Sequence, residues 1–194
     1  MTNEKWYKLF CSILRPVVRL LFPQNIKGLE NVPQGPALIC PNHSNAVDPI
    51  LVSVAMGPDV FVHHFAKAES KKIFLFGWIM RKIGSIFVKR GERDIDSFKQ
   101  CLRALKSGEK LLVFPEGTRV HGDERTEAKT GVIHMAAKTN TPIVPVYLTR
   151  DKKVFKRSVL VFGEPYCVSA RSHDEYETAA AQLMDRIWEL KDHV

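Results

Sequence analysis

Residues 36–56 read PALICPNHSNAVDPILVSVAM, and this stretch joins three local patterns. The run at 36–40 is short and apolar, which predicts a buried strand. A polar turn follows, and Asp48 with Pro49 suits the cap and first position of a helix that continues to residue 56. A strand, a turn and a helix in this order form the building unit of a sheet covered by helices.

The same alternation continues along the chain. Further strand patterns lie at 60–66, 85–90, 110–114, 142–148 and 158–163, and helical patterns at 73–83, 94–107, 130–139 and 176–191. We therefore expect an α/β domain over residues 26–194, with a mostly parallel central sheet covered by helices. In such sheets the functional groups collect where strands end and helices begin.

The composition limits the function classes. The chain has 194 residues, which suits one domain, and 29 Lys and Arg against 21 Asp and Glu give a net charge of +8. This charge attracts an anionic partner, such as a lipid, a nucleic acid or a phosphorylated substrate, although it also serves solubility alone.

The four cysteines form no CxxC pair and no histidine lies at zinc spacing, so we expect no metal site and no cofactor. No run of about 18 apolar residues indicates a membrane span, and we expect the protein in the cytoplasm.

Residues 1–25 form a distinct N-terminal segment with the pattern of an amphipathic helix. On a helix, one stripe is polar (Lys8, Ser12, Arg15, Arg19) and the opposite side is apolar (Phe10, Ile13, Leu14, Val17, Val18, Leu21). A basic helix of this kind suits docking in the headgroup region of an anionic membrane. The same pattern also suits a helix that packs on the domain. Pro16 allows two short helical pieces in place of one helix.

The turn that follows the strand at 36–40 contains two residues, His43 and Asp48, with the spacing of a catalytic pair. His43 lies at the strand exit, and Asp48 could fold its carboxylate back onto one imidazole nitrogen. That contact would fix the tautomer and leave the other nitrogen free to accept a proton. The spacing alone is weak, because an Asp before a Pro is also a common helix cap. Ser44 is the competing nucleophile, and backbone N–H groups of this turn could stabilise an oxyanion.

Two other strand ends carry groups suited to phosphate. FPEGTR at 114–119 has a turn marked by Pro115 and Gly117, which offers backbone N–H groups, a hydroxyl at Thr118 and a guanidinium at Arg119. Glu116 could orient Arg119 or bind a substrate hydroxyl. GSIFVKR at 84–90 places Arg90 at a strand end. Each of these could by itself be a plain solvated turn.

In this order the motifs resemble those of the 1-acyl-sn-glycerol-3-phosphate acyltransferases, a family of glycerolipid acyltransferases. NHSNAVD fits the first block of the family, NHxxxxD, and GSIFVKR fits the second block, which ends in Arg90. FPEGTR is the third block in full, and TPIVPVY at 141–147 fits the fourth. Phe87 and Lys89 depart from the usual second block. The resemblance covers about residues 28 to 165.

The resemblance implies an enzyme that moves a fatty acyl group from acyl-CoA or acyl-carrier protein to lysophosphatidic acid, giving phosphatidic acid. It implies that His43 is the general base and Asp48 its orienting partner. The implied acceptor-binding residues are Arg90, Glu116, Gly117, Thr118 and Arg119. Together with the basic N-terminal segment, it implies a peripheral protein on the cytoplasmic face of the cell membrane.

Two alternatives stay open at this point. One is a related acyltransferase that uses glycerol-3-phosphate or another lysophospholipid. The other is a non-catalytic basic module that binds anionic membranes or nucleic acid. The second explains the charge but not a His–Asp pair beside an intact FPEGTR, and no nucleic-acid-binding motif is present. We therefore expect no nucleic-acid partner.

Overall fold

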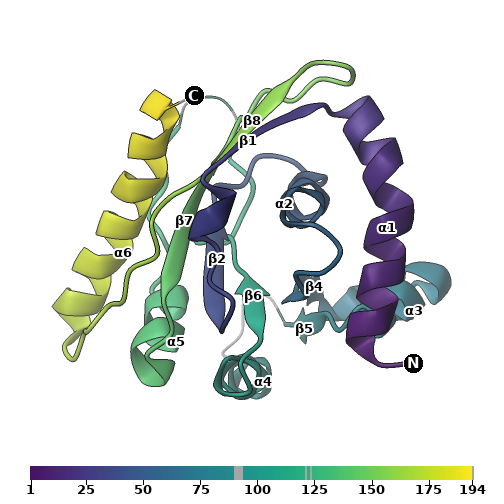
Figure 1. Ribbon diagram of the computed structural model, residues 1–194. Helices are drawn as coiled ribbons and strands as arrows, with labels where there is room; N and C mark the ends of the chain where they lie inside the picture. Colours follow the sequence, from purple (N-terminus) through teal and green to yellow (C-terminus); the bar gives the residue numbers. More distant parts are fainter. Residues whose placement is uncertain (90–93, 121, 123, 194) are drawn as a thin grey trace.

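The computed structural model describes residues 1–89, 94–120, 122 and 124–193, and its centre is a six-stranded sheet (Figure 1). The strand order is β1-β8-β7-β2-β6-β3. β8 pairs antiparallel with β7, whereas the other neighbouring strands of this sheet pair parallel. The strands are β1 Gln24–Lys27, β2 Ala37–Pro41, β3 Val62–His63, β6 Lys110–Leu112, β7 Ile143–Leu148 and β8 Ser158–Phe162. The expected α/β domain with a mostly parallel sheet is confirmed.

Helices cover both faces of the sheet. α4, α5 and α6 pack on one face, and α2 lies on the other, with α1 outside it (Figure 1). The helices are α1 Asn3–Leu21, α2 Asp48–Met56, α3 Phe74–Lys82, α4 Ile95–Lys106, α5 Gly131–Thr139 and α6 His173–Glu189, with short 3-10 turns η1 Leu29–Asn31, η2 Ala68–Lys72 and η3 Leu190–His193. Most of these bounds fall within one or two residues of the expected ones.

β2 shows why the opening stretch decides the fold. All five of its residues are buried. Leu38 and Cys40 belong to the core under α4, α5 and α6, whereas Ala37 and Ile39 belong to the core under α2. A strand that is buried on both faces reads as a continuous apolar run without polar alternation. The pattern at 36–40 therefore marks the middle of a covered parallel sheet.

The expected single strand at 60–66 is wrong. The segment divides into β3, which pairs with β6, and β4 (Phe65–Lys67), which pairs with β5 (Ile86–Val88) in a separate two-stranded sheet. The division occurs at His64, whose carbonyl accepts from the Ile86 N–H at 2.8 Å. Its ring nitrogen Nε2 also lies 2.7 Å from Ser53 Oγ. Sequence pattern cannot show this change, because both strands carry the same β-type residues.

α1 is one continuous helix with Pro16 inside it, so the two short pieces allowed by the sequence do not form. Pro16 leaves the Ser12 carbonyl without its helical donor. Both residues are exposed, so water can replace that hydrogen bond. The expected boundary between the N-terminal segment and the domain, at residue 25, lies within β1.

The amphipathic helix expected at the N-terminus uses its apolar side in two ways. Tyr7 and Cys11 are buried in the core beside α2. Ile13, Val17 and Leu20 stay 52–68% exposed. Packing on the domain therefore consumes only one edge of the apolar arc. Across the part of the chain that the structure describes, no helix combines the length and the apolar character needed to cross a bilayer.

Candidate active site

Three parallel strands bring the site together at their carboxyl ends. β2 leads into the turn with His43, β6 leads into the turn at 114–119, and β7 leads into residues 149–152. Because β2 lies between β6 and β7 in the sheet, the turn after β2 has the other two segments as neighbours. This is the sheet edge at which ligand sites of α/β proteins form.

His43 and Asp48 are paired as the spacing suggested. The imidazole Nδ1 lies 2.9 Å from Asp48 Oδ2, and the two side chains are 11% and 0% exposed. The Phe114 ring stacks on the imidazole with the centroids 4.0 Å apart. The other imidazole nitrogen, Nε2, has no hydrogen-bond partner among the described residues. With Nδ1–H donated to the carboxylate, the lone pair on Nε2 is free to accept a proton.

The Asp48 carboxylate has several partners in the preceding loop, and it does not cap the helix. Its Oδ2 also accepts from the backbone N–H groups of Ser44 and Asn45, each at 2.7 Å. Helix α2 begins at Asp48 itself with Val47 as the N-cap residue, so the expected Asp48 cap is wrong. The carboxylate turns back toward the preceding loop because the His43, Ser44 and Asn45 donors converge there. Burial alone would raise the pKa of Asp48, but the hydrogen bond with His43 and the charge of Lys152 hold this pKa below its usual value.

Glu116 connects the 114–119 turn to His43. It is 2% exposed, and its Oε2 accepts from the His43 backbone N–H at 2.8 Å. Its Oε1 accepts from Arg150 Nη2 at 2.9 Å. The sequence allows Glu116 either to orient Arg119 or to bind a substrate hydroxyl, and in the structure its guanidinium partner is Arg150. Burial raises the pKa of Glu116, against the opposing hydrogen bond from the His43 N–H and the charge of Arg150.

The residues at 117–119 lie exposed beside the histidine. Glu116 holds one end of this segment to His43, and the Val120 N–H holds the other end to the His43 carbonyl at 2.8 Å. Gly117 has a φ of +69°, which favours glycine at this turn. Gly117, Thr118 and Arg119 are all exposed, so the Thr118 hydroxyl and the Arg119 guanidinium are accessible to a ligand. The Gly117 N–H already donates to the Phe114 carbonyl at 3.1 Å, within the turn. Arg90, the remaining predicted acceptor contact, lies outside the described residues.

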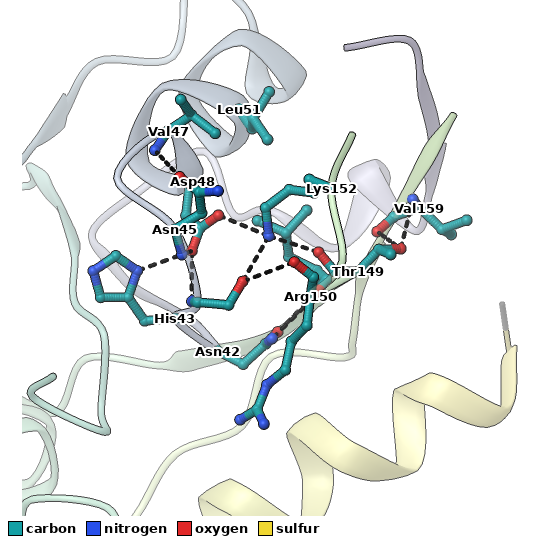
Figure 2. Close-up of polar contacts among 12 residues, drawn as sticks. Asn42, His43, Asn45, Val47, Asp48, Leu51, Thr149, Arg150, Lys152 and Val159 are labelled. Carbon is teal, nitrogen blue, oxygen red and sulfur yellow. Dashed lines mark hydrogen bonds and ion pairs between the residues drawn. The ribbon is translucent and has the colours of Figure 1, made fainter. Parts of the chain in front are cut away.

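The segment after β7 was missed by sequence reasoning. Figure 2 shows the Lys152 ammonium on the side of Asp48 away from His43. Lys152 Nζ lies 2.8 Å from Asp48 Oδ1. Arg150, besides holding Glu116, donates to the carbonyls of Gly122 and Glu124 at 2.7 and 2.5 Å and lies over the Trp188 ring. The available signal was a polar run, TRDKK, directly after a predicted strand.

Ligand-type side chains for a metal ion approach one another at one place in the described part of the chain. His173, Asp174 and Glu177 lie together on the exposed start of α6. They are surface residues of one helix turn, and nothing in the structure links them to the strand ends described above.

The sequence of this chain matches the profile of the family described as Acyltransferase over residues 24–149. The matched range includes β1, β2, β6 and β7, and with them the His43–Asp48 pair and the 114–119 turn. The chain belongs to the acyltransferase family. The contacting side chains His43 and Asp48 thus both lie inside the region matched by the family profile.

Individual relatives have names that agree with this membership. The chain is 30% identical to a 1-acyl-sn-glycerol-3-phosphate acyltransferase of Bacillus subtilis over 197 residues, which covers 96% of this chain and 97% of that protein. It is 33% identical to a chloroplastic 1-acyl-sn-glycerol-3-phosphate acyltransferase of Arabidopsis thaliana over 152 residues, or 76% of this chain and 41% of the relative. The chain spans about half the length of several such relatives.

A solved acyltransferase structure has the same fold. The crystal structure of the 1-acyl-sn-glycerophosphate acyltransferase PlsC from Thermotoga maritima aligns with a TM-score of 0.73 and covers 97% of this chain and 79% of that one. The sequence identity between the two chains is 24%, so this likeness concerns the fold.

Proposed function

We propose that this acyltransferase moves a fatty acyl group from a thioester of CoA or of acyl-carrier protein to the free hydroxyl of 1-acylglycerol-3-phosphate, giving phosphatidic acid. The observation that carries the proposal is the 2.9 Å contact of His43 Nδ1 with Asp48 Oδ2, beside the exposed 117–119 segment. The names of the relatives support the acceptor class.

The proposed reaction is a direct transfer. The acceptor hydroxyl gives its proton to His43 Nε2 while its oxygen attacks the thioester carbon. The new C–O bond forms, the C–S bond breaks, and the departing sulfur takes the proton from Nε2. Asp48 stabilises the imidazolium that exists between these two events. The products are an ester and a free thiol, and His43 returns to its starting state.

Ser44 is poorly placed to serve as a nucleophile in its present contacts. Its hydroxyl donates to the Arg150 carbonyl at 3.2 Å and accepts from Lys152 Nζ at 2.9 Å. An ammonium group cannot accept a proton, so neither partner is a base for this hydroxyl. These contacts favour the direct transfer over an acyl-enzyme at Ser44.

The suggested oxyanion donors of the His43 turn are already bound. The backbone N–H of His43 is held by Glu116, and those of Ser44 and Asn45 are held by Asp48. These three groups are therefore fixing the catalytic pair, and they are not free to bind a developing oxyanion.

The acceptor phosphate is proposed to bind at Gly117, Thr118 and Arg119, with Arg90 as a further cation. Glu116, whose two oxygens already have protein partners, is proposed to act by holding this turn against His43. Arg119→Ala is expected to raise the Michaelis constant for the acceptor by about 10- to 100-fold, since a charge-assisted contact is worth about 1.5–3 kcal/mol.

The measurement for Arg119→Ala is steady-state kinetics with the acceptor varied at saturating donor. Arg157→Ala, which removes an exposed arginine elsewhere, serves as the matched control. An Arg119→Ala enzyme with an unchanged acceptor constant would remove Arg119 from the phosphate site.

The protein is proposed to dock on the cytoplasmic face of the cell membrane through α1 and α3. Both helices carry exposed apolar residues. In α3, the Phe74 side chain is 91% exposed and that of Leu75 is 64% exposed. Trp78 of α3 packs edge-on against Trp6 of α1 at 5.5 Å, which joins the two helices into one surface. The basic side chain of Lys82 belongs to this surface, since its Nζ lies 5.6 Å from the Trp6 ring centroid and 5.8 Å from that of Trp78. The cytoplasmic leaflet carries anionic lipids, which attract such a charge. Apolar side chains that enter the bilayer and lysines that meet its headgroups both favour binding.

The docking surface can be tested by substitution, which is sharper than deletion because deleting α1 would uncover buried Tyr7 contacts. The triple change Val17→Ser, Leu20→Ser and Phe74→Ser is expected to weaken binding to anionic vesicles by about 100-fold or more, given about 1.5–3 kcal/mol per buried side chain. Flotation with vesicles measures this. Ile95→Ser, an exposed apolar residue on α4, is the control. Undiminished flotation of the triple variant would locate membrane contact elsewhere.

The function itself is tested by incubating the purified protein with 1-acylglycerol-3-phosphate and each donor type. Thiol release that depends on the acceptor, together with phosphatidic acid among the lipid products, is the expected result. A panel with glycerol-3-phosphate and other lysophospholipids separates related acceptors. Vesicle binding without thiol release from either donor would leave a non-catalytic lipid-binding module.

A further inference from the structure

The buried cation nearest the catalytic pair belongs to no motif of the sequence. The Lys152 side chain is 1% exposed, although lysine is rarely buried without a strong reason. Its Nζ lies 2.8 Å from Asp48 Oδ1, donates to Ser44 Oγ at 2.9 Å and donates to the Thr149 carbonyl at 2.6 Å. The ammonium thus has one ion-pair partner and two hydrogen-bond acceptors within one small volume, next to the residues that orient His43.

We propose that Lys152 is a positioning residue of the acyl-transfer site, which orients the Asp48 carboxylate toward His43 and offsets its charge. This inference rests on the proposed function only for its kinetic readout. The geometry behind it is independent of the substrate.

The division of Asp48 into two oxygens supports this assignment. Oδ2 receives three donors: the His43 imidazole and the N–H groups of Ser44 and Asn45. Oδ1 faces Lys152. Because the Lys152 ammonium pairs with Oδ1, it favours the carboxylate orientation in which Oδ2 is directed at the imidazole (Figure 2).

The charges around the pair define what the ammonium does. The ionisable side chains that face this volume among the described residues are His43 after β2, Asp48 at the start of α2, Glu116 after β6, and Arg150, Asp151 and Lys152 after β7. Glu116 and Arg150 neutralise each other at 2.9 Å, and Asp151 is exposed. Lys152 is therefore the counter-charge of Asp48. Without it, the carboxylate would have only the imidazole to neutralise it, and would favour a protonated His43.

The pH dependence gives a readout that a purely structural lysine would not change. In Lys152→Met, the acid-side midpoint of the kcat/KM profile is expected to move to higher pH by about one unit, because an adjacent charge shifts ionisation by about 1–3 units. The loss of carboxylate orientation is expected to lower kcat by about 10-fold or more. Lys152→Arg keeps the charge and is expected to keep the wild-type midpoint. Lys153→Met removes a lysine from the adjacent exposed position and should match the wild type in both respects.

A second measurement is independent of turnover. The imidazole of His43 can be titrated by NMR in histidine-labelled protein, with the signal assigned by its loss in a His43→Gln variant. The His43 titration midpoint is expected to be higher in Lys152→Met than in the wild type and Lys152→Arg. If Lys152→Met does not fold, Lys152→Gln gives the same comparison, since its amide can still donate to Ser44 and carries no charge.

The outcomes separate this inference from the proposed function. A shifted His43 titration in a protein with no acyl transfer would retain the positioning role and reject the proposed function. An active protein whose uncharged Lys152 variants keep both the wild-type midpoint and the wild-type kcat would overturn the positioning role.

Discussion

His43→Ala is expected to lower kcat for acyl transfer by about 1,000-fold, within the range of about 100- to 10,000-fold that a general base contributes. Its Nε2 is the nitrogen left open by the Nδ1 contact to Asp48, and the only proposed path takes the acceptor proton there. The donor and acceptor Michaelis constants should change little, since the phosphate contacts are proposed to lie at 117–119.

The fold should tolerate this change. After removal of the imidazole, Asp48 Oδ2 keeps the N–H groups of Ser44 and Asn45, and Oδ1 keeps Lys152. The His43 backbone contacts with Glu116 and Val120 do not involve the side chain. Circular dichroism and thermal unfolding check the fold, and His173→Ala, at an exposed position on α6, is the matched control. A folded His43→Ala protein with near-normal turnover would refute the mechanism.

Asp48→Asn is the second large effect, and it should damage both activity and stability. The amide oxygen can take the place of Oδ2 and accept from Ser44, Asn45 and His43. The amide NH₂ then lies against the Lys152 ammonium, so two donors meet in a buried volume. Breaking a buried ion pair in this way costs about 3–5 kcal/mol of folding free energy. The opposite amide orientation is less favourable, because it directs the NH₂ donor at the backbone N–H groups of Ser44 and Asn45, which are donors themselves.

The kinetic consequence of Asp48→Asn follows from the lost carboxylate charge. Without it the imidazolium formed during transfer is not stabilised, and a kcat decrease of about 100- to 10,000-fold is expected. Urea unfolding measures the stability part. Asp59→Asn, whose side chain is 75% exposed, is the control.

The double variant Asp48→Asn with Lys152→Met tests the cause of the instability. It removes the ammonium that the amide cannot satisfy, so it is expected to be more stable than Asp48→Asn alone while remaining just as inactive. If the single and double variants are equally stable, the unpaired Lys152 charge is not the cause of the instability of Asp48→Asn.

The elements of the fold were readable because their signals are local. The apolar runs at 36–40 and 142–148 are strands buried on both faces, and the amphipathic spacing at 94–107 is a helix with one buried side. The segment at 60–66 was not readable in full. Its division into β3 and β4 depends on which neighbouring strand each half pairs with, and β-type residues do not encode that choice.

The candidate site could likewise be predicted from the sequence only where its contacts are local. His43 and Asp48 are five residues apart, so one turn of chain sets their distance. The sequence by itself determined this pair, the turn at 114–119 and the alternation of strand and helix. Only the tertiary structure decided that Glu116 pairs with Arg150, that Lys152 pairs with Asp48, and that α1 buries one edge of its apolar arc and leaves the other exposed. These contacts join residues far apart in the chain, such as Lys152 and Ser44 at a separation of 108 residues. Their partners are set by strand order, because β6 and β7 lie on either side of β2 and bring their carboxyl ends to the same edge of the sheet.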